Sequence, residues 1–152
     1  MKYQPGGKSM NNIEYANFSN MMTEFEYVNI SDMLGKTIVD ISGGEVGNNL
    51  IIFRTSDHFE YVMKHEQNCC EGVFIEDVCG DFSDLVGHEL VESEEISGEI
   101  PPDFDESIYD SYSWTFYKFR TIRGCVVIRW FGASNGYYGE GVSIFRREIV
   151  IH

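Results

Sequence analysis

Arginine, aromatic and glycine residues gather in the last third of the sequence. Arg129 and Phe131 lead directly into residues 132–139, which contain three glycines and two tyrosines, and Arg146 and Arg147 follow. Glycines let backbone amides approach an anion, arginines form bidentate bonds to phosphate, and aromatic rings stack on bases. The side chain of Asn135 adds a donor and an acceptor that could read a base edge. These residue types predict a site for a phosphorylated nucleoside.

The candidate ligand-binding residues share positive charge, an aromatic ring or a side-chain amide. They are Arg120, Arg123, Arg129, Phe131, Asn135, Tyr137, Tyr138, Arg146 and Arg147. Neighbouring residues of a strand point to opposite faces, so at most one of the last two arginines can share a given pocket. The alternative interpretation is an ordinary aromatic core with a long hairpin loop and surface arginines.

Soft metal ligands lie together in the middle of the chain. They are His65, Cys69, Cys70 and Cys79. Zinc favours such residues, but the spacing is not that of paired C-x-x-C motifs, and buried thiols near a turn often act as small hydrophobes.

Cys70 is also a candidate nucleophile, which would need a histidine as its base. No local signature of a nucleophile surrounds it, and the neighbouring acids would raise the pKa of its thiol. We therefore expect no metal, no cofactor and no catalytic residue.

Charge is distributed unevenly along the chain. The formal net charge is −14, from 25 acidic and 11 basic residues. No Lys or Arg lies between Lys64 and Lys118, where there are 15 carboxylates, whereas basic residues outnumber acids from residue 113 onward. The net charge argues against general binding to nucleic acid or to anionic membranes. The two halves either face different partners or face each other, within the fold or across a subunit boundary.

The length of 152 residues is that of one domain. We expect residues 1–30 to form a poorly ordered or loosely packed N-terminal extension and residues 31–152 to form a single β-rich nucleotide-binding domain. No apolar run approaches the roughly 18 residues of a membrane span, and no apolar block follows the first lysines, so we expect a cytoplasmic protein without a signal peptide.

Alternating and β-branched segments predict the secondary structure. The expected strands are 36–42, 50–55, 59–64, 73–78, 90–96, 112–121, 125–131 and 142–149, although 73–78 could instead be a helical turn. Turn residues at 43–49 and 56–58 favour an antiparallel meander of the first three strands. Segment 90–96 is a possible acidic edge strand, and 112–131 is a hairpin. A short helix is expected near 18–25, and a single helical turn is expected within 81–87, capped by Asp81 or Ser83 and running through Leu85. Residues 97–110 form a surface loop. The predicted class is α+β, with a mainly antiparallel sheet of six to seven strands and one or two short helices.

Several short motifs together resemble a family of small proteins encoded by bacteriophages and prophages. They are Leu34-Gly35-Lys36, Asn68-Cys69-Cys70-Glu71, the IEDVCGD run at 75–81, Asp84-Leu85-Val86-Gly87 and the SNGYYG run at 134–139. The resemblance extends from about residue 33 to residue 148. Within this range, residues 97–110 are an acidic insertion. Residues 1–30 lie outside the resemblance.

Within that group the chain resembles the type 1 Thoeris anti-defence proteins. These are phage sponges that bind, without cutting it, the cyclic ADP-ribose isomer made by an activated TIR-domain enzyme, and some members bind cyclic oligonucleotides at a separate site. The resemblance implies immune evasion in the cytoplasm of the infected bacterial host by a homo-oligomer, with arginines and aromatic residues holding the ligand at a subunit boundary. It matches the loop at Asn135 and the arginines Arg146 and Arg147; the other candidate residues rest on local chemistry.

Two further functions remain open from the sequence. The acidic middle of the chain is compatible with a phage inhibitor that mimics the charge of DNA and binds a host DNA-binding or defence protein. A small enzyme that uses Cys70 or the carboxylates is the third possibility.

Overall fold

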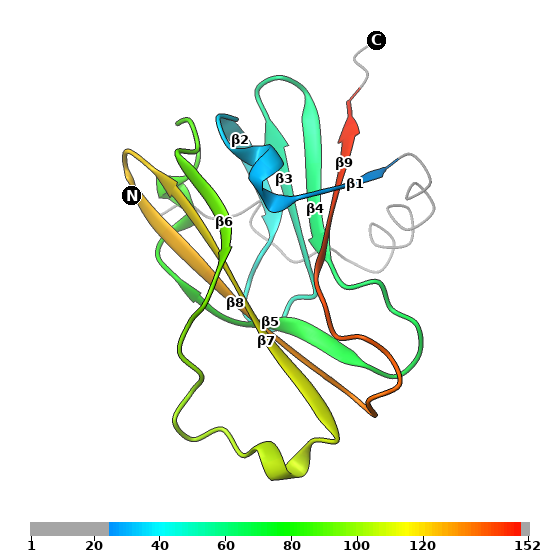
Figure 1. Cartoon of the computed structure of the whole chain (residues 1–152). Coiled ribbons are helices and arrows are strands. Elements are labelled where there is room, and N and C mark those ends of the chain that lie inside the picture. Colours follow the sequence, from blue (N-terminus) through cyan, green and yellow to red (C-terminus); the bar gives the residue numbers. More distant parts are fainter. Residues whose placement is uncertain (1–24, 150–152) are drawn as a thin grey trace.

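The computed structural model describes residues 25–149, which form two antiparallel β-sheets (Figure 1). The five-stranded sheet has the order β1 (Glu26–Val28), β9 (Ser143–Glu148), β4 (Phe59–Lys64), β3 (Leu50–Thr55) and β2 (Ile38–Gly43). The four-stranded sheet has the order β5 (Gly72–Cys79), β8 (Gly124–Ser134), β7 (Ser111–Thr121) and β6 (Glu92–Ile96).

The predicted meander is confirmed by the pairing of β2 with β3 and of β3 with β4. A tight turn ends β2 at Gly43, which has a φ of 74°. A side chain at this position would meet the backbone of Leu50, so glycine satisfies both the turn and the close approach. The predicted acidic edge strand is also confirmed, because β6 lies at one edge of its sheet.

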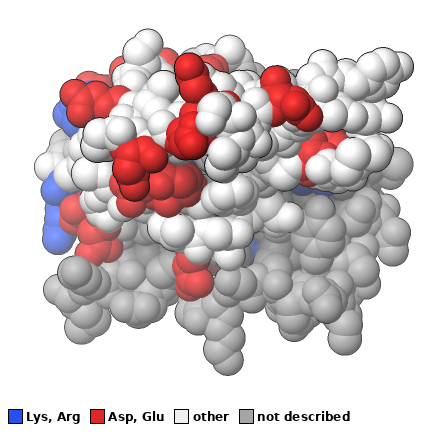
Figure 2. Space-filling view, turned by 90° about the horizontal axis from the view of Figure 1, so that it is seen from below, with Lys and Arg blue, Asp and Glu red and all other residues white. Residues whose placement is uncertain are grey.

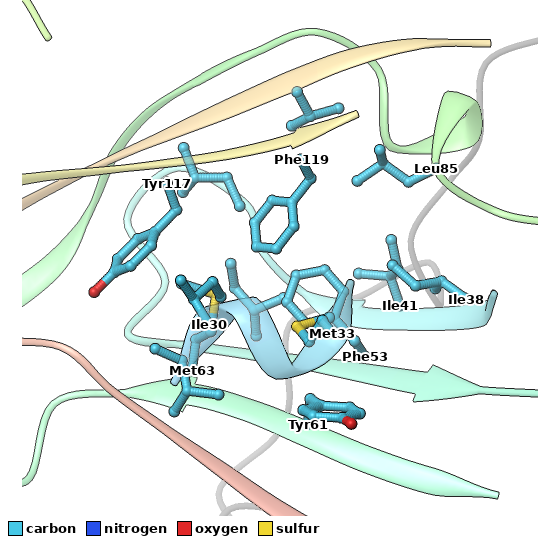
Figure 3. Close-up of a cluster of buried hydrophobic side chains, with 14 of the residues drawn as sticks. Ile30, Met33, Ile38, Ile41, Phe53, Tyr61, Met63, Leu85, Tyr117 and Phe119 are labelled. Atoms are coloured by element: carbon cyan, nitrogen blue, oxygen red, sulfur yellow. The ribbon is translucent and has the colours of Figure 1, made fainter. Parts of the chain in front are cut away.

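The main hydrophobic core lies between the two sheets (Figure 3). Phe53 and Met63 contribute from the five-stranded sheet, and Tyr117 and Phe119 from the hairpin of β7 and β8. The rings of Phe53 and Phe119, both fully buried, meet across the core with centroids 5.2 Å apart. This contact joins the sheets and leaves the opposite face of the four-stranded sheet available for other groups.

The prediction of a mainly antiparallel β-protein is confirmed, but residues 25–149 are mostly β rather than α+β: they form nine strands in two sheets instead of six to seven, and their helical segments are 3-10 turns. These turns are η2 (Ile30–Met33), η3 (Phe82–Asp84) and η4 (Glu106–Ile108), with side-chain caps from Asn29, Asp81 and Asp105. Each cap stabilises a single turn, and no apolar pattern of period 3.6 follows to extend it. Asp81 caps the single helical turn expected within 81–87, and residues 73–78 are a strand.

Of the expected N-terminal extension, residues 1–30, the structure describes only residues 25–30. These residues belong to the two-sheet fold, because β1 pairs with β9 and Ile30 is buried in the core. The helix expected near 18–25 falls on residues outside the described range, apart from Phe25. Between residues 25 and 149, no helix is long and apolar enough to cross a membrane.

Candidate functional site

The outer face of the four-stranded sheet carries an aromatic cluster. Alternation along β8 directs Val126, Ile128 and Trp130 into the core and places Phe131 on the opposite face. Cross-strand pairing then sets Phe131 opposite Trp114 of β7 and Phe74 of β5. The ring centroids of Phe131 and Trp114 are 4.7 Å apart, and those of Phe131 and Phe74 are 5.8 Å apart.

The acidic segment 97–110 lies across this face and supplies two more rings. Phe104 contacts Trp114 edge to face, with centroids 5.2 Å apart, and Tyr109 contacts Phe131 at 5.1 Å. Phe104 and Tyr109 also stack on each other, with an interplanar angle of 15°. The segment is a loop, as expected, but its aromatic side chains turn inward while its carboxylates stay exposed. It therefore forms the outer wall of a pocket.

The pocket between these elements has a volume of about 150 Å³. Its lining is almost entirely aromatic: Phe74, Phe104, Tyr109, Trp114 and Phe131, with Glu76 as the polar member. Pockets that enclose a drug-sized ligand measure roughly 300–1,000 Å³. This pocket can therefore hold one planar ring system rather than a whole nucleotide.

One cation stands beside the aromatic rings. Arg129 pairs with Glu76, lies 3.9 Å from Asp77, and donates to the carbonyl of Glu99 at 3.4 Å. Its guanidinium is also 5.7 Å from the ring centroid of Trp114, within the range of a cation–π contact. The indole N–H of Trp114 is buried and finds no hydrogen-bond acceptor among residues 25–149. A planar ligand with an acceptor atom could satisfy this donor.

The structure brings only two of the nine predicted residues, Arg129 and Phe131, to this pocket. Arg120 lies further along β7, where it shares Glu92 with Lys118, and Arg123 is exposed in the turn between β7 and β8. These two arginines therefore lie outside the aromatic cluster.

The loop after β8 is ordered by its own side chains. Asn135 accepts a hydrogen bond from the backbone N–H of Tyr137 at 3.0 Å, and Ser134 accepts one from Gly136. Tyr137 and Tyr138 meet edge to face, and Tyr137 is 82% exposed. The amide oxygen of Asn135 thus stabilises the loop, whose tyrosines do not line the aromatic pocket.

Arg146 and Arg147 belong to β9 of the other sheet and point to opposite faces, as predicted. Arg146 pairs with Glu26 and Asp32, whereas Arg147 pairs with Glu60. Their separation from Arg129 follows from sheet membership, which local sequence does not reveal. The candidate residues are therefore spread over at least three places.

Charged residues of the acidic middle and the basic end pair with each other inside the fold. Lys118 and Arg120 meet Glu92 across the β6–β7 pair, and Arg129 meets Glu76 across the β5–β8 pair. Cross-strand pairs of opposite charge are favourable neighbours in antiparallel sheets. This arrangement favours the interpretation in which the two halves of the chain face each other.

A second polar cluster, which the sequence interpretation missed, surrounds Glu71 in the β4–β5 connection. The buried Glu71 carboxylate faces Nε2 of His65 at 3.0 Å and accepts from the backbone N–H groups of Asn68 and Cys69. Nδ1 of His65 is 2.6 Å from the carbonyl of Gly141, so the ring ties the connection to the end of the β8–β9 loop. Because Gly72 pairs with Ala133, the Glu71 cluster lies at the end of the four-stranded sheet that is far from the β7–β8 turn.

Cys69, Cys70 and Cys79 are exposed rather than buried. Within residues 25–149, no group of three or more His, Cys, Asp or Glu side chains is arranged to hold a metal ion. The hydrogen bond with Cys70 is the largest of the effects that raise the pKa of the Cys69 thiol above its usual value, and the charge of Glu71 acts in the same direction.

The pocket residues absent from the predicted set are Phe74, Glu76, Phe104, Tyr109 and Trp114. One available signal was the alternation of 112–121, which sets Trp114 on the same face as Lys118 and Arg120. No comparable signal marks Phe104 and Tyr109, because they lie in an irregular segment whose path depends on the sheet beneath it.

Fold and site together describe a two-sheet antiparallel β-protein with an aromatic pocket on the outer face of its smaller sheet. Residues 31–144 match the family described as Domain of unknown function (DUF7448), and the chain belongs to this family. No curated protein and no solved structure matches the chain. The family match runs from η2 to β9 and includes every residue of the pocket lining.

Proposed function

We propose that this protein is a phage anti-defence protein that binds and sequesters a cyclic nucleotide immune signal without cleaving it. The proposed ligand is a cyclic ADP-ribose isomer, with cyclic oligonucleotides as further ligands, and the proposed place of action is the cytoplasm of the infected bacterial host. The observation that carries the proposal is the aromatic pocket with Arg129 at its edge. Sequestration requires binding and water exclusion but no general acid, base or nucleophile.

In this proposal the base enters the pocket and stacks on the rings. Aromatic stacking suits any base, because every base has a π-face. A phosphate near the rim would compete with Glu76 for Arg129, and a guanidinium binds phosphate bidentately. The ribose and the second phosphate extend beyond a cavity of about 150 Å³. We propose that a second copy of the chain covers them, in a homo-oligomer.

The experiment is isothermal titration calorimetry with cyclic ADP-ribose isomers and a panel of cyclic di- and trinucleotides. Trp114→Ala is expected to weaken binding about 5- to 150-fold, because one stacked base contributes roughly 1–3 kcal/mol. Ile122→Ala, at an 80% exposed turn position, is the matched control and should bind like the wild type.

Three results would contradict parts of the proposal. Binding that is unchanged in a folded Trp114→Ala variant but lost in Tyr137→Ala would move the site to the β8–β9 loop. Recovery of degraded ligand after denaturation would indicate an enzyme. Absence of binding to every member of the panel would remove the sponge function.

The second candidate function, an acidic inhibitor of a host DNA-binding or defence protein, is favoured by one surface. Exposed carboxylates line the strand β6 and the segment after it: Glu94, Glu95, Glu99, Asp103, Asp105, Glu106 and Asp110. Figure 2 shows acidic side chains over the described part of the face seen from below, with basic ones mainly at its margin. Such a surface suits a cationic protein partner.

This alternative predicts a complex that weakens steeply with salt. The triple variant Asp103→Asn, Asp105→Asn, Glu106→Gln should weaken it strongly, while the amides retain the cap of η4 and an acceptor for Tyr112. The measurement is pull-down of host DNA-binding proteins at increasing ionic strength. Equal capture by the wild type and the triple variant would argue against charge mimicry.

A further inference from the structure

Two adjacent cysteines stand exposed in the β4–β5 connection. The sulfur atoms of Cys69 and Cys70 are 2.9 Å apart, and neither takes part in a disulfide bond. Both side chains point away from the core, so small reagents in solution can reach them. The other two cysteines of the chain, Cys79 and Cys125, are in β5 and β8.

The backbone around the pair is held by Glu71. Its carboxylate accepts from the N–H of Cys69 at 2.7 Å and from that of Asn68 at 3.2 Å. The side chain of Gln67 donates to the carbonyl of Cys69 at 3.1 Å and to that of Glu71 at 2.6 Å. These bonds close a compact turn that keeps the two thiols side by side instead of splayed to opposite sides, as in a strand.

We propose that Cys69 and Cys70 form a reversible two-electron redox site, which closes to a vicinal disulfide by exchange with a low-molecular-weight disulfide such as oxidised glutathione. One cysteine thiolate attacks the oxidant, forms a mixed disulfide and releases one glutathione thiolate. The neighbouring thiolate then attacks the protein sulfur of the mixed disulfide and releases the second glutathione. Two protein thiols are oxidised, one glutathione disulfide is reduced, and the two thiol protons end on the two released glutathiones.

Reversibility follows from the geometry of adjacent residues. Their Cα atoms are about 3.8 Å apart across a trans peptide bond, whereas disulfides usually join Cα atoms roughly 4.4–6.8 Å apart. The closed ring is therefore strained, and strained exposed disulfides are the easily reduced ones. A bond of this kind works as a switch rather than as a structural cross-link.

The turn that would change on oxidation is the one that contacts Glu71. Closing the ring rotates the peptide between the two cysteines, which carries the carbonyl of Cys69 that accepts from Gln67. Gln67 also donates to the carboxylate of Glu71, the residue that holds His65, so the change reaches Glu71 through this side chain. We therefore expect oxidation to lower the urea midpoint of the wild type. The same treatment should change the midpoint of Glu71→Gln much less, because the charged acceptor is already absent.

The test treats the full chain with oxidised glutathione, blocks the remaining thiols with iodoacetamide and cleaves after glutamate. Cleavage after Glu66 and Glu71 releases residues 67–71, which carry both cysteines and separate them from Cys79. We expect this peptide to be lighter by two hydrogens and unalkylated, and to regain both alkylation sites after treatment with excess reduced glutathione. Cys79 and Cys125 have no adjacent thiol with which to close a ring, so each should carry either an alkyl group or one glutathione.

Cys69→Ser and Cys70→Ser are the matched variants. Each should stop at the mixed disulfide and keep one glutathione on the remaining cysteine, whereas Cys79→Ser should close like the wild type. The proposal is overturned if the wild type also stops at a mixed disulfide, if it forms dimers linked through residues 67–71, or if the peptide stays fully alkylated.

Discussion

Phe119→Ala is expected to lower the free energy of unfolding by about 3–5 kcal/mol, the usual range for removing a buried phenylalanine from a core. Phe119 is fully buried and touches Phe53 of the opposite sheet. Its removal leaves a cavity at the contact that joins the sheets. The measurement is urea denaturation followed by circular dichroism, with Tyr137→Ala as an aromatic control at an exposed position.

The partner ring allows a sharper form of the same test. In a double-mutant cycle with Phe53→Ala, we expect a coupling of about 0.5–1.5 kcal/mol, the range for aromatic pairs beyond their buried area. A loss below about 1 kcal/mol in Phe119→Ala, together with no coupling to Phe53, would contradict the packing of the two sheets. Such a result would also remove the scaffold beneath the aromatic pocket.

The second large effect is expected from pH and from Glu71. Burial alone would raise the pKa of this carboxyl, but the hydrogen bonds from His65, Cys69 and Asn68 outweigh it and lower the pKa from 4.5 to about 2. Because the folded state binds this proton more weakly than the unfolded state, Glu71 stabilises the fold fully above pH 4.5. That contribution is lost progressively as the pH falls from about 4.5 to about 2.

Glu71→Gln removes the titrating group and should therefore flatten the acid side of the stability profile. The measurement is the urea midpoint of wild type and variant from pH 7 to pH 2. The wild type should be clearly the more stable protein at pH 7, and the difference should shrink below pH 4.5. Glu89→Gln, at an exposed carboxyl, is the control. If the difference between the two urea midpoints stayed constant from pH 7 to pH 2, the negative charge of Glu71 would not be the source of its stabilising effect.

The aromatic pocket is formed partly by strands and partly by a loop. Phe74, Trp114 and Phe131 are positioned by cross-strand register, whereas Phe104 and Tyr109 come from the segment 97–110. That segment also carries exposed acids, so a variant that shortens it would alter the pocket and the acidic surface together. Point variants such as Trp114→Ala separate the two proposed functions better than a deletion does.

Local patterns were sufficient to predict most of the strands. Alternation and turn residues located β2, β3 and β4, and the hairpin of β7 and β8, because strand period and turn chemistry are properties of neighbouring residues. The same reasoning placed Arg146 and Arg147 on opposite faces. It also located the single turn that Asp81 caps, but counting such a turn as a helix gave an α+β class where the described residues are mostly β.

The composition of the pocket depended on contacts between residues far apart in the chain. The sequence interpretation placed Arg129 and Arg146 in one candidate set, yet they belong to different sheets and pair with different carboxylates. Phe104 contacts Phe131 because the segment 97–110 crosses the outer face of the four-stranded sheet. The thiols of Cys69 and Cys70 lie side by side because hydrogen bonds to Glu71 stabilise the turn that contains them. Strand periodicity determines which face a residue shares with its near neighbours. Sheet order, register and loop path determine which distant residues meet it, because they follow from the packing of the whole core.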